Sequence, residues 1–238
     1  MGRAKEIIIK VIPSNTANDF VKKHHYSGKV VNNSSLHFGC FLDNKMHGVM
    51  SFGSPTDKRK VLHLVEPCLW NEMLELNRMA FDDYLPKNSE SRCFSVAIKL
   101  IKKNAPHIKW ILSFSDSCQC GDGTIYRASG FKLTNIKENN RLIRFKNGFL
   151  THGLNLCHRG SPLISKKYNP ENLTENQLHK RGDFEYIKGF QLRYIYLINK
   201  SCKITVPILP FSKIDEMGAG MYKGEKITIA ERKQASEA

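Results

Sequence analysis

The sequence predicts an α+β protein with a mixed, strongly bent β-sheet that carries helices on both of its faces. β-branched and aromatic runs of strand length alternate with amphipathic stretches of helix length along the chain. The predicted order is strand and helix, two strands, strand, helix, strand, helix and two strands. Strands and helices are therefore both expected along the chain, and neither is confined to one end of it. Hydrophobic residues make up 41% of the 238 residues and aromatic residues 10%, which is sufficient for a packed core.

Turn and capping residues set the boundaries of these elements. Pro13 ends the first strand, and Ser14 can cap the helix that follows. Asp43 and Asn44 tolerate a positive φ and predict a tight hairpin, while Asn88 is the expected N-cap of the longest helix. The predicted elements up to Phe145 are a strand over 5–12, a helix from Ser14 to the 24–28 corner, strands over 36–42, 46–52 and 73–79, a helix over 89–104, a strand over 109–115, a short helix over 124–129, and paired strands over 131–133 and 142–145.

The last third of the chain is less regular. Residues 151–189 are polar and basic without a clear period, which predicts an insertion or a lid. Strands are expected over 190–198 and 203–209, and the tail beyond Lys223 is expected to be loose. We therefore expect a catalytic core over 1–150, a basic insertion over 151–189, and C-terminal strands and a tail over 190–238 that pack on the core.

The charge of the chain points to a polyanionic partner. Lys and Arg number 37 against 22 acidic residues, which gives a formal net charge of +15, and nucleic acid is the leading candidate. A basic surface that only maintains solubility is the alternative. The basic residues expected to contact DNA phosphates are Lys58, Arg59, Lys60, Arg141, Arg144, Arg159, Lys166 and Lys167.

No segment of the sequence predicts export, membrane anchoring or a structural zinc site. There is no run of about 20 apolar residues and no signal-peptide pattern, so we expect a soluble, intracellular protein with no membrane partner. The seven cysteines are odd in number and scattered, as is typical of reduced thiols. Cys118 and Cys120 are separated by one residue, which is not the spacing of a zinc knuckle.

Several motifs resemble known protein families. Tyr126, Gly130 and Phe131, at the end of a predicted helix that follows a central strand, resemble the GCN5-related N-acetyltransferase (GNAT) superfamily. A more specific set resembles the Mom family of phage DNA-modification proteins over most of the chain. This set comprises His25-Tyr26-Ser27-Gly28, Leu76-x-Arg78, Asn88-Ser89-Glu90-Ser91, Ser113-Phe114-Ser115-Asp116, the run from Gly121 to Phe131, Arg193-Tyr194-Ile195-Tyr196 and Pro207-Ile208-Leu209-Pro210.

The resemblance implies an N-acetyltransferase-like fold and conversion of adenine N6 in double-stranded DNA to N6-carbamoylmethyladenine, which protects phage DNA from restriction. The glycine-rich pyrophosphate loop of ordinary acetyltransferases is absent here, so the donor is unknown, with acyl-CoA or a glycine-derived group as candidates. The helix N-terminus at Asn88, Ser89 and Ser91 still offers free N–H groups to an anionic cofactor, although Glu90 opposes one.

Asp116 and Tyr126 are the main catalytic candidates. Asp116 ends the central strand, where open sheets place ligands, and can accept the N6 proton or ligate a metal; its alternative role is to cap the next turn. Tyr126 can protonate a leaving group or position the base, or it can be a packed aromatic residue.

Four further residues complete the predicted site. His25 and Tyr26, with Asp116, can bind a metal such as iron, or can be an ordinary helix-end pair. Arg78 can clamp a carboxylate or phosphate, with an ion pair to Glu75 or Asp82 as the alternative. Ser91 can orient the cofactor or nucleophile, or can satisfy the first helical turn.

Base-modifying enzymes extrude the target base, and Tyr26, Tyr126 and Phe52 are aromatic residues available to hold it. Two other functions compatible with the sequence are an acetyl-CoA-dependent N-acetyltransferase that acts on protein or a small amine, and a non-catalytic DNA-binding protein. The protein is expected to be a monomer or a homodimer.

Overall fold

The computed structural model describes residues 3–120, 123–222 and 225–226, and the chain divides into two compact units. Unit one consists of residues 1–114, 123–135 and 193–210, and unit two of residues 115–122, 136–192 and 211–238. Three long strands pass from one unit into the other along the chain. The described strands are β1 (Ile8–Val11), β2 (Ser34–Leu42), β3 (Lys45–Gly53), β4 (Val65–Glu66), β5 (Met73–Phe81), β6 (Trp110–Asp116), β7 (Lys132–Phe145), β8 (Leu150–His152), β9 (Phe184–Leu197), β10 (Lys203–Ile204), β11 (Met221–Tyr222) and β12 (Glu225–Lys226).

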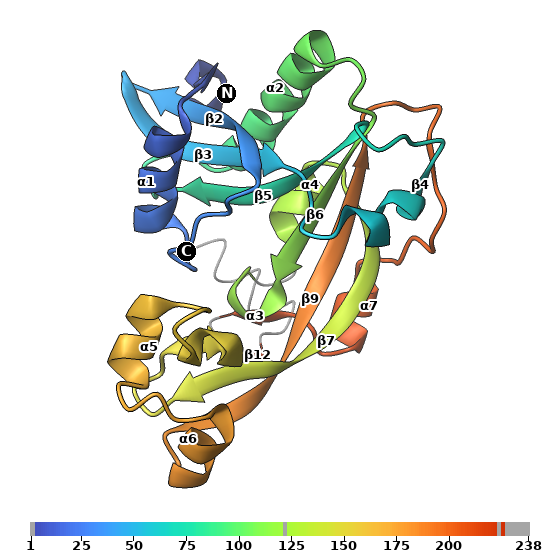
Figure 1. The fold of residues 1–238 in the computed structure, drawn as a ribbon. Helices are drawn as coiled ribbons and strands as arrows, with labels where there is room; N and C mark the ends of the chain where they lie inside the picture. The colour runs from blue at the N-terminus through green and yellow to red at the C-terminus, as the bar shows by residue number, and fades with distance from the viewer. Residues whose placement is uncertain (1–2, 121–122, 223–224, 227–238) are drawn as a thin grey trace. The chain divides into compact units, whose positions relative to one another are not determined.

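The described residues form a mixed eight-stranded sheet in the order β1-β2-β3-β5-β6-β9-β7-β8, in which β7 and β9 lie side by side (Figure 1). Pairing of β5 with β6 is parallel, whereas β1 with β2, β2 with β3 and β3 with β5 are antiparallel.

The α-helices are α1 (Ser14–His24), α2 (Ser89–Asn104), α3 (Ser117–Cys120), α4 (Thr124–Ala128), α5 (Pro162–Tyr168), α6 (Glu175–Arg181) and α7 (Ser212–Glu216), and the 3-10 turns are η1 (Arg3–Glu6), η2 (Lys58–Lys60), η3 (Leu62–Leu64) and η4 (Gly153–Leu156). The predicted fold class, a mixed sheet with helices, is confirmed.

In unit one, α1 and α2 cover opposite faces of the sheet. Ala17, Phe20 and Val21 of α1 pack against Val49 and Ala80 in one buried cluster. On the other face, Phe94 of α2 packs against Phe131 and Tyr196, with ring centroids 4.9 and 5.3 Å apart. Because the side chains of a strand alternate between faces, each helix buries its own row of strand residues.

The two predicted strands over 131–133 and 142–145 are instead one strand, β7, of 14 residues. The intervening polar residues were expected to form a turn. They stay extended because β7 pairs along its length with the equally long β9, and Thr134 of β7 bonds to Arg193 of β9. Sheet pairing in the folded protein therefore overrides the local preference of a polar segment.

One strand boundary and one helix N-cap differ from expectation, whereas the expected N-cap of α2 is confirmed with an unexpected backbone conformation. The first strand is shorter than 5–12, because Arg3 and Glu6 form an ion pair of 3.1 Å within the 3-10 turn η1. Pro13 is the N-cap of α1 and makes no side-chain bond, so Ser14 is the first helical residue. Asn88 is the N-cap of α2, but in the left-handed conformation, with φ of 68° and no capping bond from its side chain.

Residues 151–189 hold more structure than their composition predicts. They contain most of β8, the turn η4, both α5 and α6, and the start of β9. Thr174 caps α6 with a full capping box to Gln177, a local signal that was overlooked. The expected strand over 203–209 reduces to β10, which pairs with β4.

The expected loose tail beyond Lys223 lies almost wholly outside the described residues, and the predicted division into 1–150, 151–189 and 190–238 stays a prediction. No helix in the described part of the chain has the length and apolar character needed to span a membrane.

Replacement of Phe94 tests the core under α2. Phe94 is 2% exposed, so Phe94→Ala removes its contacts with Phe131 and Tyr196 and leaves a cavity. We expect the free energy of unfolding to fall by about 3–5 kcal/mol, measured by urea denaturation. Lys99→Ala, on the exposed side of the same helix, should change it by less than about 0.5 kcal/mol. Equal effects of the two substitutions would contradict this packing.

Candidate active site

The site in unit one is built around an irregularity in β5. The register between β5 and β6 runs from Met73 to Leu76, whereas β5 continues against β3 as far as Phe81. Along β3, Phe52 pairs with Leu76 and the adjacent Ser51 pairs with Arg78, so the extra residue, Asn77, forms a β-bulge. The bulge directs Arg78 to the face covered by α1, where Val49 pairs with Ala80.

The Arg78 guanidinium is held by main-chain carbonyls. Its Nε donates to the oxygen of Lys29 at 2.8 Å, and its Nη1 donates to the oxygen of Asn77 at 2.7 Å. Burial lowers the pKa of Arg78, and the nearby Tyr26, Glu75 and Tyr126 act in the opposite direction. Arg78 therefore lies within electrostatic range of all three.

Of the two carboxylates considered as ion-pair partners of Arg78, Glu75 acts on it through its charge, whereas Asp82 pairs with another residue. Asp82 instead accepts from Nδ1 of His47 at 2.9 Å. Glu75 acts on Arg78 through its charge, and burial raises the pKa of the Glu75 carboxyl. A carboxylate near a partly buried guanidinium makes the site less cationic than Arg78 alone would.

His25 lies at the corner after α1 and is neutral near pH 7. Burial, followed by the charge of Arg78, lowers the pKa of His25 to about 4. Its Nδ1 accepts the backbone N–H of Ser27 at 3.1 Å and lies 2.8 Å from the Ser27 hydroxyl, which itself accepts from the Lys29 N–H. This pattern assigns the proton of the neutral ring to Nε2. Nε2 is thus a hydrogen-bond donor, and the Tyr26 ring lies 4.2 Å from the His25 ring.

Tyr126 is fixed by packing and by one hydroxyl contact. Its ring stacks on Tyr194 with centroids 4.6 Å apart and planes 11° apart, and its Oη lies 3.1 Å from Oγ of Ser113. The Ser113 hydroxyl can also donate to the oxygen of Leu76 at 3.2 Å. Because a hydroxyl donates only one hydrogen bond, a Ser113 hydroxyl that donates to Leu76 accepts a hydrogen bond from the Tyr126 hydroxyl.

Gly123 permits this arrangement. It starts α4 with φ of 69°, and a Cβ at this position would collide with the hydroxyl of the fully buried Tyr194. The preceding motif residues Gly121 and Asp122 lie outside the described residues.

Unit one therefore brings His25, Tyr26 and Tyr126 each within electrostatic range of Arg78. Asp116 belongs to unit two, where its Oδ1 accepts the N–H of Cys118 at 3.0 Å. Burial raises the pKa of the Asp116 carboxyl. Its capping of the next turn is thus observed, and its joining the other four residues stays a prediction.

A cavity of about 710 Å³ opens in unit one beside the start of α2. Asn88 and Ser91, two of the three predicted cofactor residues, line it, whereas Ser89 is buried and donates to the oxygen of Pro86. The Oγ of Ser91 donates to the oxygen of Asn88 at 3.2 Å. Three basic residues also line the cavity, Lys5, Lys87 and Arg92. Because of these three basic residues, the cavity is better suited to an anionic group than the motif Asn88-Ser89-Glu90-Ser91 by itself indicates.

The predicted metal set of His25, Tyr26 and Asp116 stays a prediction. Among the described residues, no group of three or more His, Cys, Asp and Glu side chains could hold a metal ion. In addition, Nδ1 of His25 is engaged with Ser27 and Nε2 carries the proton, so the ring as placed offers no lone pair to a metal.

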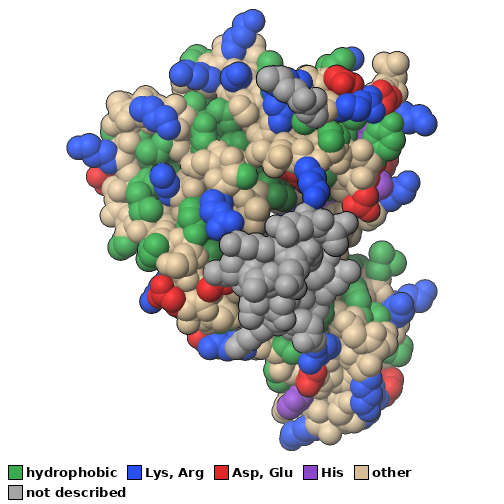
Figure 2. All heavy atoms as spheres, turned by 180° about the vertical axis from the view of Figure 1, so that it is seen from behind, with side chains coloured by type: hydrophobic (Ala, Val, Ile, Leu, Met, Phe, Trp, Pro, Cys, Tyr) green, Lys and Arg blue, Asp and Glu red, His purple; other side chains and the backbone are tan. Residues whose placement is uncertain are grey.

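Lys and Arg side chains are scattered over the face shown in Figure 2 rather than gathered in one patch. Several of the predicted DNA contacts have partners within the protein. Lys58 is 9% exposed with Nζ over the Trp70 ring, and Arg59 and Lys60 lie 3.9 and 3.1 Å from Asp57.

The remaining predicted DNA contacts lie in unit two. Arg141 pairs with Glu175, and Arg144 pairs with Glu185 at 2.7 Å. By contrast, Arg159, Lys166 and Lys167 are exposed. Which of the predicted residues contact DNA stays a prediction.

One proposed stacking residue is wrong. Phe52 is 0% exposed and packs edge-on against Phe38, with centroids 5.9 Å apart, so it cannot hold an extruded base. Tyr26, by contrast, is 54% exposed.

Sequence reasoning missed several residues of the site. Tyr194 and Ser113 were quoted as motif residues without a role, and only the fold shows that both contact Tyr126. Lys87 and Arg92 flank the predicted cofactor motif, and their charge next to a helix start was the signal that could have identified them.

The model of the Mom protein family matches residues 6–213. The methylcarbamoylase Mom of Escherichia phage Mu is 31% identical over 194 residues, which cover 80% of this chain and 78% of that protein. Among solved structures, the IAA acetyltransferase of Bacillus cereus ATCC 14579 is 8% identical with a TM-score of 0.45, and covers 80% of this chain and 99% of its own. The ribosomal-protein-S18-alanine N-acetyltransferase of Escherichia coli is 9% identical with a TM-score of 0.45, and covers 81% of this chain and 94% of its own. At a TM-score of 0.45, neither likeness carries an argument about this chain.

The lowered pKa of His25 predicts a pH dependence of stability. Between its ordinary pKa of 6.5 and about 4, the unfolded chain binds a proton that the folded protein excludes. The free energy of unfolding should therefore decrease as pH falls through this window, by on the order of 1–3 kcal/mol. Urea denaturation at pH 7, 6, 5 and 4 should show a flatter profile for His25→Gln than for the unsubstituted protein. Parallel profiles would mean that His25 titrates normally.

Proposed function

The chain belongs to the Mom protein family, and we propose that it is a DNA-modifying transferase that converts the N6 amine of adenine in double-stranded DNA to N6-carbamoylmethyladenine. The observation that carries the proposal is the 31% identity to a methylcarbamoylase over four-fifths of the chain. The proximity of His25, Tyr26 and Tyr126 to Arg78 in unit one supports it, because these motif residues are far apart in the sequence. The modification would protect phage DNA from restriction in the cytoplasm of a bacterial host.

The reaction requires that N6 become a better nucleophile. The lone pair of an exocyclic amine is delocalised into the purine ring, so removal of a proton in the transition state helps the attack. Asp116 suits that role, because burial raises the pKa of its carboxyl towards the range of a useful base. Tyr126, with its hydroxyl against Ser113, can relay or donate a proton.

His25 and Arg78 can stabilise negative charge on the donor. Nε2 of a neutral His25 donates one hydrogen bond without adding a charge that would repel Arg78. Arg78 is anchored by the oxygens of Lys29 and Asn77 through two of its nitrogens, which fixes the orientation of the guanidinium. Tyr26, exposed and next to His25, is the better placed of the two tyrosines to stack on an extruded adenine.

The donor would bind in the cavity at the start of α2. Lys5, Lys87 and Arg92 favour an anionic portion such as the phosphates of an acyl-CoA. Transfer of an acyl carbon, however, leaves a carbonyl attached to N6, whereas the proposed product carries a methylene there. A glycyl ester or thioester would give N6-glycyladenine, with the N6 proton leaving on the released alcohol or thiol. This adduct is an isomer of N6-carbamoylmethyladenine. A rearrangement that breaks the N6–carbonyl and methylene–amine bonds and forms N6–methylene and carbonyl–amine bonds would complete the reaction without a change of composition.

Nucleoside mass spectrometry tests the activity. Plasmid DNA from bacteria that express the protein should contain a heavier deoxyadenosine, and Tyr126→Phe or Arg78→Lys should lower its yield by about 100-fold or more. Because the glycyl and carbamoylmethyl adducts have equal masses, fragmentation against authentic standards is needed to separate them. Unmodified deoxyadenosine with the intact protein, or acetylated protein or small amines instead, would refute the proposal.

Tyr84→Phe is the matched control for Tyr126→Phe. Tyr84 is 54% exposed, and its hydroxyl donates to Asp43 outside the site, so its loss should leave the yield unchanged. An equal loss of yield in both variants would mean that the hydroxyl of Tyr126 has no particular role.

The donor cavity can be probed with acetyl-CoA. Isothermal titration should give a dissociation constant that Arg92→Ala raises at least about fivefold, because a charge-assisted bond to phosphate is lost. Lys99→Ala on the same helix does not line the cavity and should leave the constant unchanged. Absence of binding to the intact protein would exclude acyl-CoA and favour a smaller donor.

A further inference from the structure

The basic residues of the segment 136–192 in unit two fall into two groups, those that pair with a carboxylate of the segment and those that do not. The segment 136–192 contains five carboxylates, and each pairs with a basic side chain. The basic residues so engaged are Arg141, Arg144, Arg181 and Lys188. With every acid of the segment engaged, the remaining Lys and Arg side chains carry positive charge that this part of unit two does not neutralise.

Three exposed residues of α5 lie on one side of that helix. Leu163, Lys166 and Lys167 follow the i, i+3, i+4 spacing that places side chains on a common face. Leu163 is 83% exposed, the highest exposure among the large apolar side chains of the described chain. The opposite side of the helix is fixed to the unit by the buried Ser165 and by Tyr168, which stacks on Phe149.

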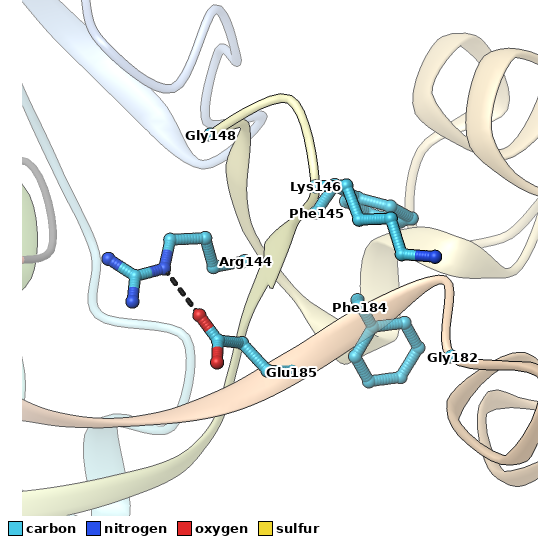
Figure 3. Close-up of a pocket in the computed structure, with 7 residues that line it drawn as sticks. All are labelled: Arg144, Phe145, Lys146, Gly148, Gly182, Phe184 and Glu185. Carbon is cyan, nitrogen blue, oxygen red and sulfur yellow. Dashed lines mark hydrogen bonds and ion pairs between the residues drawn. The ribbon is translucent and has the colours of Figure 1, made fainter.

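The turn between β7 and β8 contacts the other side of α5. Nδ2 of Asn147 lies 3.2 Å from the hydroxyl of Tyr168, which faces the unit rather than Leu163, Lys166 and Lys167. In Figure 3 the side chain of the adjacent Lys146 points away from the Arg144–Glu185 ion pair. Leu163, Lys166 and Lys167, called here the α5 face, combine two positive charges that have no carboxylate partner in this segment with one apolar side chain.

We propose that the α5 face is where unit two binds duplex DNA. Lys166 and Lys167 contact backbone phosphates, and Leu163 makes an apolar contact with sugars or base edges in a groove. The proposal rests on the proposed function insofar as DNA is the substrate. It assigns DNA to lysines whose charge no carboxylate of the segment neutralises, although Nζ of Lys167 lies 5.3 Å from the centroid of the Tyr168 ring. Arg141 and Arg144, by contrast, have their charges matched within the protein. An anionic membrane is the less suitable partner, because a helix of seven residues presents a single exposed leucine to it.

The charge contribution is tested by the salt dependence of binding. Fluorescence anisotropy with a labelled duplex, measured at several salt concentrations on the full chain, gives the slope of log affinity against log salt. Lys166→Ala/Lys167→Ala should reduce the magnitude of that slope by about 2 and weaken binding roughly tenfold near physiological salt.

The matched control is Lys102→Ala/Lys103→Ala. These are likewise adjacent exposed lysines in the last turn of a helix, but they lie on α2 in unit one. The control should leave both slope and affinity unchanged. If the α5 variant behaves like the unsubstituted protein, or if both double variants lose equal slope, the α5 face is not the DNA surface.

The apolar contribution has a different signature. Leu163→Ala should weaken binding roughly fivefold with an unchanged salt slope, because burial of an apolar side chain releases no counterions. Leu69→Ala, at a side chain 70% exposed in unit one, is the control and should have no effect. Unchanged affinity in Leu163→Ala, or tighter binding to anionic vesicles than to DNA, would overturn the proposed contact.

These outcomes are distinguishable from failure of the proposed activity. A protein whose salt slope depends on Lys166 and Lys167, yet which leaves deoxyadenosine unmodified, would retain the DNA surface and lose the proposed chemistry. If deoxyadenosine is modified but the salt slope does not change in Lys166→Ala/Lys167→Ala, the proposed activity stands and the α5 face is not the DNA surface.

Discussion

The β-bulge at Asn77 is the constraint on which the site in unit one depends, because it directs a cationic side chain into a partly buried position. Arg78 donates hydrogen bonds to the main-chain oxygens of Lys29 and Asn77, so its position depends on the conformation of the loop after α1. A guanidinium taken out of water requires such partners, and removal of any of them would leave charge uncompensated. The corner that carries His25 is therefore fixed by the same interactions that fix Arg78.

The charge of Arg78 also sets the chemistry of its neighbours. Together with burial, it keeps His25 neutral, and the hydrogen bonds of Ser27 then select the tautomer. A neutral imidazole that donates from Nε2, in electrostatic range of a guanidinium, supplies a hydrogen-bond donor without a second positive charge. Such a pair of groups suits a developing oxyanion or a carbonyl.

The two units use charge in different ways. In unit one, basic residues are gathered at the donor cavity by the geometry of α2, where Arg92 lies one turn into the helix. In unit two, acidic residues neutralise some basic residues and leave others unmatched, so the number of basic residues says little about where a polyanion binds. The net charge of +15 is thus a property of the whole chain, whereas the surface that can meet phosphate is a small part of it.

The sequence by itself determined the elements whose signals are local. Asp43 and Asn44 do adopt positive φ in the predicted hairpin, and Gly130, with φ of 85°, ends the short helix that carries Tyr126. It also determined the family, since the Mom family model matches residues 6–213. Only the tertiary structure decided that the polar segment of β7 stays extended, because its partner β9 is remote in sequence. For the same reason, the contact of Tyr194 with Tyr126 and the pairing of Arg144 with Glu185 were beyond local patterns, since each joins residues that only strand pairing or packing brings together.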